Sequence, residues 1–428
     1  MAVYTLGCKV NQFESACLSE RFQAQGWEAV PFKEKADLYI INSCAVTAEA
    51  QRQSAQMVRQ AVRNHPESVV LAAGCAGQLF PEEFTKIPGL DYVIGHFNKL
   101  QIPDLIGSPE KSTQSRTILF PEAVQPLEAH FPLPGGKTRA FLRIQDGCNA
   151  QCSYCLVPKA RGLSRSLSMD EVVSGVNFLS RQGVKELVLT GIHLGQYGGD
   201  LSPAIALVSL LERLLELHPH LYFRLSSLEP QEVTPSLLNL FKKFPNLCPH
   251  FHIPLQAGDE SILQKMNRTY SVEYYRRLIQ TIRREIPHAA IGADLIVGFP
   301  GEGETQFQNT LSLISEIPLS YLHIFPFSPR PGTPAAGFPD PVPEKIKKER
   351  IQRVRSMDRI KREEFIHHCL GQTFSALVLQ PSKEIGWSKA LTENYLTVSI
   401  PGRFKKNDRI RVRLKALEPT GLRGEYIH

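Results

Sequence analysis

The fold of this chain is decided by the stretch Phe141–Gly162, which reads FLRIQDGCNAQCSYCLVPKARG. Its first four residues alternate between the two faces of a β-strand, and the polar residues that follow predict an exposed loop. That loop carries Cys148, Cys152 and Cys155 in the spacing C-x-x-x-C-x-x-C, and we call these residues the central triad. Thiolate sulfur is the preferred ligand of zinc and of iron–sulfur clusters, so the spacing predicts a metal site.

The number of ligands separates the two kinds of metal site. A structural zinc ion takes four protein ligands, and no fourth candidate stands at finger-like spacing from the central triad. Three thiolates on a four-iron cluster leave one iron open to a small molecule. This spacing after a strand resembles the radical S-adenosylmethionine (SAM) superfamily, whose three-cysteine cluster binds SAM at the open iron. A zinc-binding or redox-inert loop remains the alternative.

The length of 428 residues predicts about two to four domains. Nine cysteines, an odd number in a chain of this size, do not fit a secreted disulfide framework and favour metal binding or catalysis. No apolar run approaches the roughly 18 residues of a membrane helix, and residues 1–7 predict the start of a strand rather than a signal peptide. We therefore expect a soluble cytoplasmic protein that has no membrane partner.

The net charge of +7 is unevenly distributed. Residues 341–428 hold 19 Lys and Arg against 10 Asp and Glu, so the last fifth of the chain is basic. A polyanionic partner is one interpretation of this charge. A basic helix that keeps the protein soluble is the other.

Residues 1–106 alternate short apolar runs with helical patterns, which predicts a doubly wound parallel sheet. Cys8, Cys44 and Cys75 each stand directly after a predicted strand, in GCKVN, NSCAVT and GCAGQ. Because the carboxyl ends of parallel strands meet at one edge of a sheet, these three should converge, and we call them the N-terminal triad. The predicted strands are residues 3–6, 38–42, 69–73 and 92–94, and the predicted helices are residues 11–25 and 48–64.

A linker is predicted over residues 107–137, which are rich in Pro, Ser, Gly and charge and contain PGG at 134–136. Residues 138–370 then predict an incomplete β/α barrel of six parallel strands, whose chemistry belongs at the strands' carboxyl ends. Five of these ends are followed by polar or special sequences: TGIHLGQYG, SSLEP, PLQAGDE, GFPGEGE and PFSPRPGT. The strands are expected from Leu142 and at residues 187–189, 223–225, 251–253, 291–297 and 322–324.

Residues 371–428 predict a small β-barrel, with strands at 374–379, 396–400 and 410–417 separated by Gly, Pro, Asn and Asp. Between the two barrels, a charged helix is expected over residues 343–369. The remaining cysteines, Cys17, Cys248 and Cys369, are isolated, and we expect them to be small buried apolar residues.

In this order, the parts resemble the methylthiotransferase family over nearly the whole chain. The family has an N-terminal three-cysteine domain, a radical SAM barrel and a TRAM domain. GCKVNQ and NSCAVT resemble most the bacterial branch that acts on N6-threonylcarbamoyladenosine beside the tRNA anticodon. Ala45, Ala257 and Gly303 depart from the pattern expected in their motifs, and they bear more on the branch than on the reaction.

The resemblance implies two [4Fe-4S] clusters. The central triad would hold the cluster that reduces SAM, and the N-terminal triad an auxiliary cluster involved in sulfur delivery. The carbon 2 C–H bond of adenine is unactivated, so a cofactor radical has to supply the chemistry. One SAM would give a 5′-deoxyadenosyl radical that removes the hydrogen, and a second would supply the methyl group. The candidate SAM-holding residues are Thr190, Gly191, Glu229 and Gln256.

The implied partners are tRNA, held at the anticodon stem-loop, an electron donor such as flavodoxin or ferredoxin, and a sulfur source. Arg161, Arg165 and Arg330 are weaker candidates for phosphate or substrate contact, with solvation at the surface as the expected alternative. Other possibilities are methylthiolation of isopentenyladenosine in tRNA or of a ribosomal protein, and different radical SAM chemistry on another RNA. A non-catalytic RNA-binding protein that senses iron or oxygen is an alternative of a different class.

Overall fold

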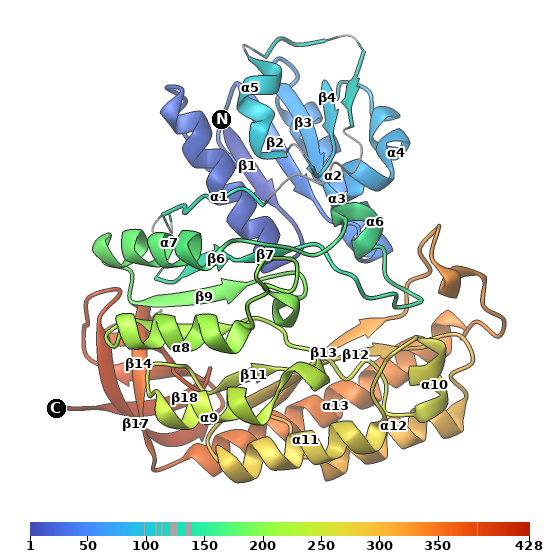
Figure 1. The fold of residues 1–428 in the computed structure, drawn as a ribbon. Coiled ribbons are helices and arrows are strands. Elements are labelled where there is room, and N and C mark those ends of the chain that lie inside the picture. The colour runs from blue at the N-terminus through green and yellow to red at the C-terminus, as the bar shows by residue number, and fades with distance from the viewer. Residues whose placement is uncertain are drawn as a thin grey trace.

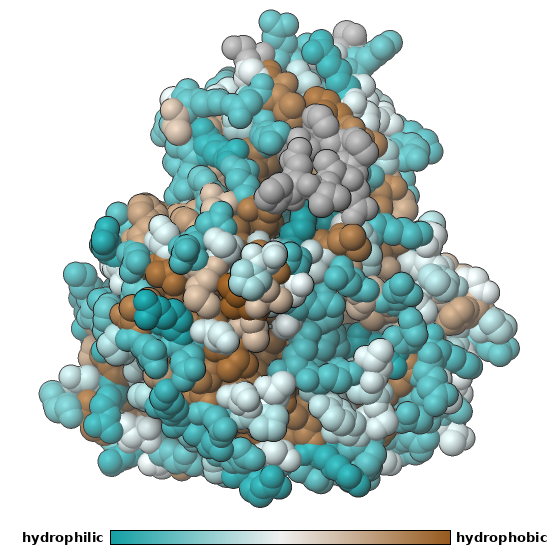
Figure 2. Space-filling view, viewed as in Figure 1, coloured by the Kyte–Doolittle hydropathy of each residue, from teal (hydrophilic) through white to brown (hydrophobic). Residues whose placement is uncertain are grey.

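The computed structural model describes residues 1–97, 99–107, 109–112, 114–119, 127–133, 135, 138–382 and 384–428. Figure 1 shows an N-terminal sheet domain stacked on a larger barrel domain, with the C-terminal strands beside that barrel at the lower left. Hydrophilic side chains cover most of the face in Figure 2. Within the described ranges, no helix is long and apolar enough to span a membrane.

The N-terminal domain is a parallel sheet whose described strands run in the order β1-β2-β3-β4-β5. Every residue of β2 and β3 is buried, as expected for strands covered on both faces. Helix α1 packs in the hydrophobic cluster on one face, and α2 packs in the cluster on the other. The elements are β1 (Ala2–Thr5), α1 (Lys9–Ala24), β2 (Leu38–Ser43), α2 (Ala48–Asn64), β3 (Val69–Gly74), α3 (Cys75–Leu79), α4 (Pro81–Thr85), β4 (Tyr92–Ile94), α5 (Ile102–Ile106) and β5 (Arg116–Ile118).

The segment that we expect to be a linker contains β5, which pairs with β4 and extends the N-terminal sheet. Of the PGG sequence at 134–136, only Gly135 is among the described residues. The domain boundaries at residues 106, 137 and 370 remain predictions.

The central domain is an open barrel of parallel strands. Two described three-stranded sheets, β6-β9-β10 and β11-β12-β13, meet where Phe223 bridges Leu247 and the Cys248 N–H donates to the Phe223 carbonyl at 2.8 Å. The barrel strands are β6 (Ala140–Arg143), β9 (Glu186–Thr190), β10 (Tyr222–Leu225), β11 (His250–His252), β12 (Ala290–Val297) and β13 (Tyr321–Pro326). A short β7 (Gln145–Asp146) pairs with β8 (Arg165–Ser166) beside the cysteine loop.

Helices cover the outside of this barrel (Figure 1). Helix α11 shows why: its buried residues stand at positions i, i+3, i+4 and i+7 and form one apolar stripe, made of Tyr275, Leu278, Ile279 and Ile282. The helices of this domain are α6 (Val157–Arg161), α7 (Met169–Arg181), α8 (Leu207–Leu217), α9 (Pro235–Lys243), α10 (Glu260–Lys265), α11 (Val272–Glu285), α12 (Glu304–Glu316) and α13 (Glu344–Cys369).

The C-terminal residues close into a barrel in the order β14-β15-β16-β18-β17, which confirms the small β-barrel. The sequence patterns missed β15 and β18, and in β18 Gly421 and Gly424 resemble turn residues. The strands are β14 (Thr373–Pro381), β15 (Trp387–Thr392), β16 (Thr397–Pro401), β17 (Arg409–Glu418) and β18 (Gly421–Ile427).

This C-terminal barrel packs against the amino ends of the central strands. The ring of Tyr395 stacks on that of His250, with centroids 4.0 Å apart, and Arg224 donates to the Glu393 carbonyl at 2.9 Å. Arg409 lies over the ring of Tyr222. The amino end of the central barrel is therefore covered, and the carboxyl end faces the N-terminal domain.

Candidate active site

The central triad lies on the loop that leaves strand β6. Gly147, with φ +75°, makes the turn before Cys148, and a Cβ on it would lie 1.9 Å from the Leu163 carbonyl oxygen. Only glycine fits this close approach in the left-handed region. The loop is closed by the Cys148 N–H, which donates to the Gly162 carbonyl at 3.0 Å. Backbone N–H groups point at the sulfurs, from Ala150 to Cys148 and from Val157 to Cys155, both at 3.4 Å.

The N-terminal triad lies at the carboxyl ends of three neighbouring strands. Cys8 precedes α1, Cys44 follows β2, and Cys75 is the first residue of α3. Gly7 brings two of them close, because a Cβ on it would lie 2.9 Å from both Cβ and Sγ of Cys44. The parallel order of β1, β2 and β3 therefore gathers cysteines that lie far apart in sequence.

Both triads line one cavity of about 340 Å³ between the N-terminal sheet and the rim of the barrel. Gly191, Glu229 and Gln256, three of the candidate SAM residues, line it as well. Thr190 is fully buried and is not part of the lining, and within the described part of the chain its hydroxyl has no hydrogen-bond partner. SAM binding by these four residues remains a prediction.

Burial raises the pKa of the Cys44 thiol and of the Cys155 thiol, each to about 12. These thiols would be neutral at pH 7 unless a cation bound to the sulfur. Metal binding must therefore supply the free energy of deprotonation, as expected of a cluster site.

Cationic side chains lie beside both triads. Arg268 donates to Cys152 Sγ at 3.2 Å and also pairs with Glu229. His193 Nδ1 lies 3.2 Å from Cys148 Sγ, and its Nε2 lies 2.6 Å from Glu232. Burial alone would lower the pKa of His193, but the bonds to Cys148 and Glu232 outweigh it and raise the pKa to about 10. A sulfur-rich anionic group would therefore meet positive charge here.

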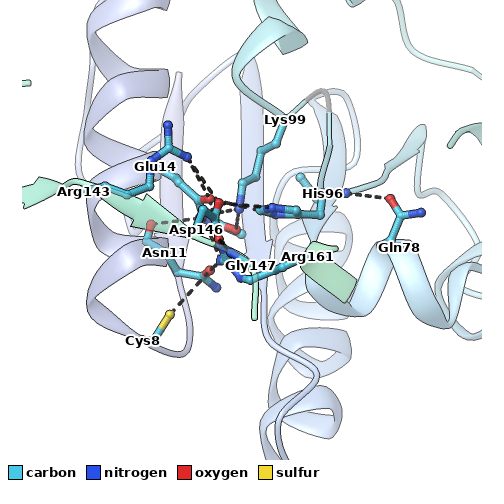
Figure 3. Close-up of polar contacts among 12 residues, drawn as sticks. Cys8, Asn11, Glu14, Gln78, His96, Lys99, Arg143, Asp146, Gly147 and Arg161 are labelled. Atoms are coloured by element: carbon cyan, nitrogen blue, oxygen red, sulfur yellow. Dashed lines mark hydrogen bonds and ion pairs between the residues drawn. The ribbon is translucent and has the colours of Figure 1, made fainter. Parts of the chain in front are cut away.

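A buried ionic network joins the two domains beside the cavity (Figure 3). Glu14 on α1 pairs with Lys99 and lies 3.1 Å from Arg161 of α6. Arg161 also bonds Asp146 at 2.9 Å and Asn11 at 2.5 Å. Burial raises the pKa of the Glu14 carboxyl, but Arg161 and Lys99 outweigh it and lower that pKa to about 2. The Glu14 carboxylate therefore stays charged at neutral pH.

The expectation that the three arginines would be surface-solvated is wrong for two of them. Arg161 and Arg330 are buried, with 1% and 4% of their surface exposed. Arg330 bonds Gln51 of α2 and lies over the ring of Phe80. Arg165 is half-buried, and it donates to the Arg161 carbonyl at 3.3 Å. Arg161 and Arg330 therefore tie the barrel to the N-terminal domain.

Sequence reasoning missed several residues of this site. His193 stands in TGIHLGQYG, a strand ending in which the sequence pattern pointed to Thr190 and Gly191 but not to His193. Arg268 follows α10, away from any strand ending, and no sequence signal pointed to it.

The prediction for the three isolated cysteines is confirmed, because all of them are fully buried: Cys17, Cys248 and Cys369.

Glu14→Gln is expected to destabilise the protein by about 3 kcal/mol or more, because Lys99 would keep a buried charge without its carboxylate partner, and Arg161 would lose one carboxylate and keep Asp146. Thermal unfolding of the iron-loaded protein would measure this. Glu49→Gln is the matched control, since Glu49 makes an exposed ion pair with Arg52 and should leave the melting temperature unchanged. Equal melting temperatures for all three proteins would mean that the network contributes no stability.

Comparisons with known proteins identify the class of protein to which the central barrel belongs. Residues 142–314 match the Radical SAM superfamily, and residues 1–95 match a family described as uncharacterized protein family UPF0004. The radical SAM methyltransferase TsrM from Kitasatospora setae shares the fold, with a TM-score of 0.55 and 14% identity, covering 76% of this chain and 72% of its own. The central barrel is therefore a radical SAM domain.

Two curated relatives narrow the assignment. Threonylcarbamoyladenosine tRNA methylthiotransferase MtaB of Aquifex aeolicus is 37% identical, over 96% of this chain and 99% of its own. A tRNA-2-methylthio-N(6)-dimethylallyladenosine synthase of Moorella thermoacetica is 33% identical, over 99% of this chain and 98% of its own. The chain belongs to the tRNA methylthiotransferase family of radical SAM transferases.

Proposed function

We propose that this enzyme methylthiolates carbon 2 of N6-threonylcarbamoyladenosine beside the anticodon of tRNA. The observation that carries the proposal is the single cavity lined by both cysteine triads. Inserting sulfur at an unactivated carbon requires a radical source and a sulfur source at the same atom. One cavity with two three-thiol sites meets that requirement.

The donor sets fit two [4Fe-4S] clusters, one on each triad. Each triad offers three sulfurs and has an arginine nearby, Arg268 for the central triad and Arg161 for the N-terminal triad. Three protein ligands leave one iron of each cluster open. When bound, the central cluster supplies the electron that cleaves SAM to methionine and a 5′-deoxyadenosyl radical.

The residues on the barrel rim would orient SAM over the central triad. Gly191 leaves its part of the cavity open. A side chain at this position would clash, because its Cβ would lie 2.6 Å from the Gln145 side chain. Gln256 takes the unusual φ of +62°, and its backbone N–H donates to the Asp294 carbonyl at 2.8 Å. Glu229 is held by Arg268. These residues are therefore the groups that we expect to contact SAM.

The threonylcarbamoyl branch is favoured over the dimethylallyl branch by GCKVNQ and NSCAVT and by the relative from Aquifex aeolicus. The tRNA anticodon stem-loop would be the RNA partner. A flavodoxin or ferredoxin would donate electrons, and a separate sulfur source would renew the auxiliary site. We propose a cytoplasmic location, where tRNA is modified.

The test is anaerobic turnover of the reconstituted protein with SAM, dithionite and three RNA stem-loops. One carries N6-threonylcarbamoyladenosine, one N6-dimethylallyladenosine and one plain adenosine at the same position. We expect the nucleoside mass of the methylthio product from the first RNA alone. Product from the dimethylallyl RNA alone would contradict the proposal and assign the protein to the other branch.

The C-terminal barrel is proposed to hold the tRNA through its outward basic residues. The alternation of side chains along a strand predicts that Arg409, Arg411 and Arg413 share one face of β17. Arg411 and Arg413 are exposed there, and Arg403 and Lys405 are exposed on the preceding loop. Arg409 is not exposed with them. It bonds Ser375 at 2.8 Å and lies over Tyr222 at the contact between the barrels.

Replacing Arg403, Lys405 and Arg411 with glutamine is expected to weaken tRNA binding, because fewer counterions would be released from the phosphates. Each lost contact lowers the slope of log affinity against log salt by roughly 0.7 to 0.9, so the triple variant should lose about 2 units of slope. Substitution is preferable to deletion here, because the C-terminal barrel covers the amino end of the central barrel.

The matched control replaces three exposed arginines on the outer helices α8 and α11, Arg213, Arg277 and Arg284, with glutamine. It removes the same charge from a surface that we do not expect to face RNA. Filter-binding titrations at several salt concentrations compare the three proteins. Equal slopes for both variants would mean that the C-terminal charge acts only through the net charge of the protein.

A further inference from the structure

Three polar side chains form a cluster inside the barrel, beside the cysteine cavity. His252 on β11, Asp294 on β12 and His323 on β13 come from neighbouring strands, and Asp294 and His323 are direct cross-strand partners. Asp294 Oδ1 lies 3.1 Å from His252 Nε2 and 3.2 Å from His323 Nδ1. We call these three residues the lumen triad.

The lumen triad is connected to the cavity that holds the cysteines. Asp294 lines that cavity, and so does Ser227, whose hydroxyl lies 2.7 Å from His252 Nδ1. Ser227 thus holds His252 at Nδ1, while Nε2 lies near Asp294 but has no hydrogen-bond partner among the described residues. The His323 side chain is half exposed, against 8% for that of His252. The ring of His323 does not line the cysteine cavity; it borders a different cavity of about 380 Å³, together with Tyr321 and Arg362. An extended ligand group that passes Asp294 from the cysteine cavity could therefore reach the half-exposed ring of His323.

An apolar cavity of about 180 Å³ adjoins the lumen triad and shares Asp294 and Gln256 with the cysteine cavity. Tyr154, Phe325 and Phe327 contribute rings to its lining. Aromatic walls suit a flat purine, because bases stack on such rings. The lumen triad places polar groups beside this otherwise apolar wall. The combination indicates a ligand with a base at one end and hydrogen-bonding groups next to the base.

We propose that the lumen triad recognises the polar N6 substituent of the target adenosine, with His323 as the specificity residue. This rests on the proposed function, since carbon 2 and the N6-bearing carbon both flank ring nitrogen N1. A group on N6 therefore lies next to the reacting carbon, and next to the cavity where both triads meet. The threonylcarbamoyl group offers amide N–H groups, a hydroxyl and a carboxylate to two imidazoles and one aspartate.

A dimethylallyl group would be a poor fit at the same wall. It has no donor or acceptor, so binding it would strip water from the lumen triad without replacing the lost hydrogen bonds. Sites built to hydrogen-bond a substrate group discriminate strongly against an analogue that lacks the group. The lumen triad therefore selects for the threonylcarbamoyl adenosine and against the dimethylallyl one.

The experiment measures the affinity of the iron-loaded protein for three labelled stem-loops, bearing threonylcarbamoyl, dimethylallyl or plain adenosine. Wild type should bind the first about tenfold more tightly than plain adenosine, as one hydrogen bond to a charged group allows. His323→Leu should bring that ratio close to one while leaving the affinity for plain RNA unchanged. His323→Gln keeps a donor and an acceptor and should restore part of the ratio.

His367→Leu is the matched control, because His367 is exposed on α13, and it should keep the wild-type ratio. A full tenfold ratio in His323→Leu would overturn the inference while leaving the proposed function intact. A stoichiometric zinc or manganese ion that disappears in His323→Leu would also overturn it, since the lumen triad would then be a metal site. Methylthiolation of the dimethylallyl RNA alone by wild type would instead refute the proposed function itself.

Discussion

Replacing Cys148, Cys152 and Cys155 together with alanine is expected to abolish SAM cleavage and to halve the iron content, from about eight to about four atoms per chain. The N-terminal triad lies on separate strands and would keep its own cluster. Without the central sulfurs, the barrel itself would hold no cluster that could reduce SAM. Iron assays and chromatography of 5′-deoxyadenosine after anaerobic reconstitution measure both quantities.

The matched control replaces the three isolated cysteines, Cys17, Cys248 and Cys369, with alanine. It removes the same number of thiols, but these are buried in hydrophobic cores and should hold no iron. Its iron content should equal that of wild type. SAM cleavage at the wild-type rate in the central-triad variant, or zinc in place of iron in wild type, would contradict the assignment of the radical site.

Replacing Cys8, Cys44 and Cys75 together with alanine is expected to separate the two halves of the reaction. The central triad and its contacts with Arg268 and His193 come from the barrel alone, so SAM cleavage should continue. The methylthio product should disappear, because the sulfur-bearing site would be lost. Parallel measurement of 5′-deoxyadenosine and of methylthio nucleoside shows the separation directly.

Product at the wild-type rate from the same variant would mean that the N-terminal triad has no role in sulfur insertion. Loss of both SAM cleavage and iron from the central site would mean that the two domains depend on each other for folding. The melting temperature of the variant separates that result from a chemical effect.

The fold was largely predictable because its strands are either fully buried or followed by distinctive loops. β2 and β3 contain the apolar runs of residues 38–41 and 69–73, and all residues of both strands are buried. The convergence of Cys8, Cys44 and Cys75 followed from parallel strand order alone. The central triad was evident from its spacing, because three thiols on one short loop suit few roles other than metal binding.

The contacts between domains were not predictable in the same way. Arg161 resembled a surface arginine in the sequence, but its partners Asn11 and Glu14 lie about 150 positions earlier. The periodicity of a sequence predicts which face of a helix or strand is buried. It does not predict which charged residues form ion pairs across a domain boundary. The lumen triad was missed for the same reason, since His252, Asp294 and His323 meet only when three strands align.

The most direct measurement of the central claim is mass spectrometry of tRNA nucleosides from cells with and without this gene. The account predicts that 2-methylthio-N6-threonylcarbamoyladenosine disappears when the gene is deleted and that its unmethylthiolated precursor accumulates. Re-expression of wild type should restore it, and the central-triad variant should not. Unchanged levels of that nucleoside, with loss of the methylthio dimethylallyl nucleoside instead, would contradict the account.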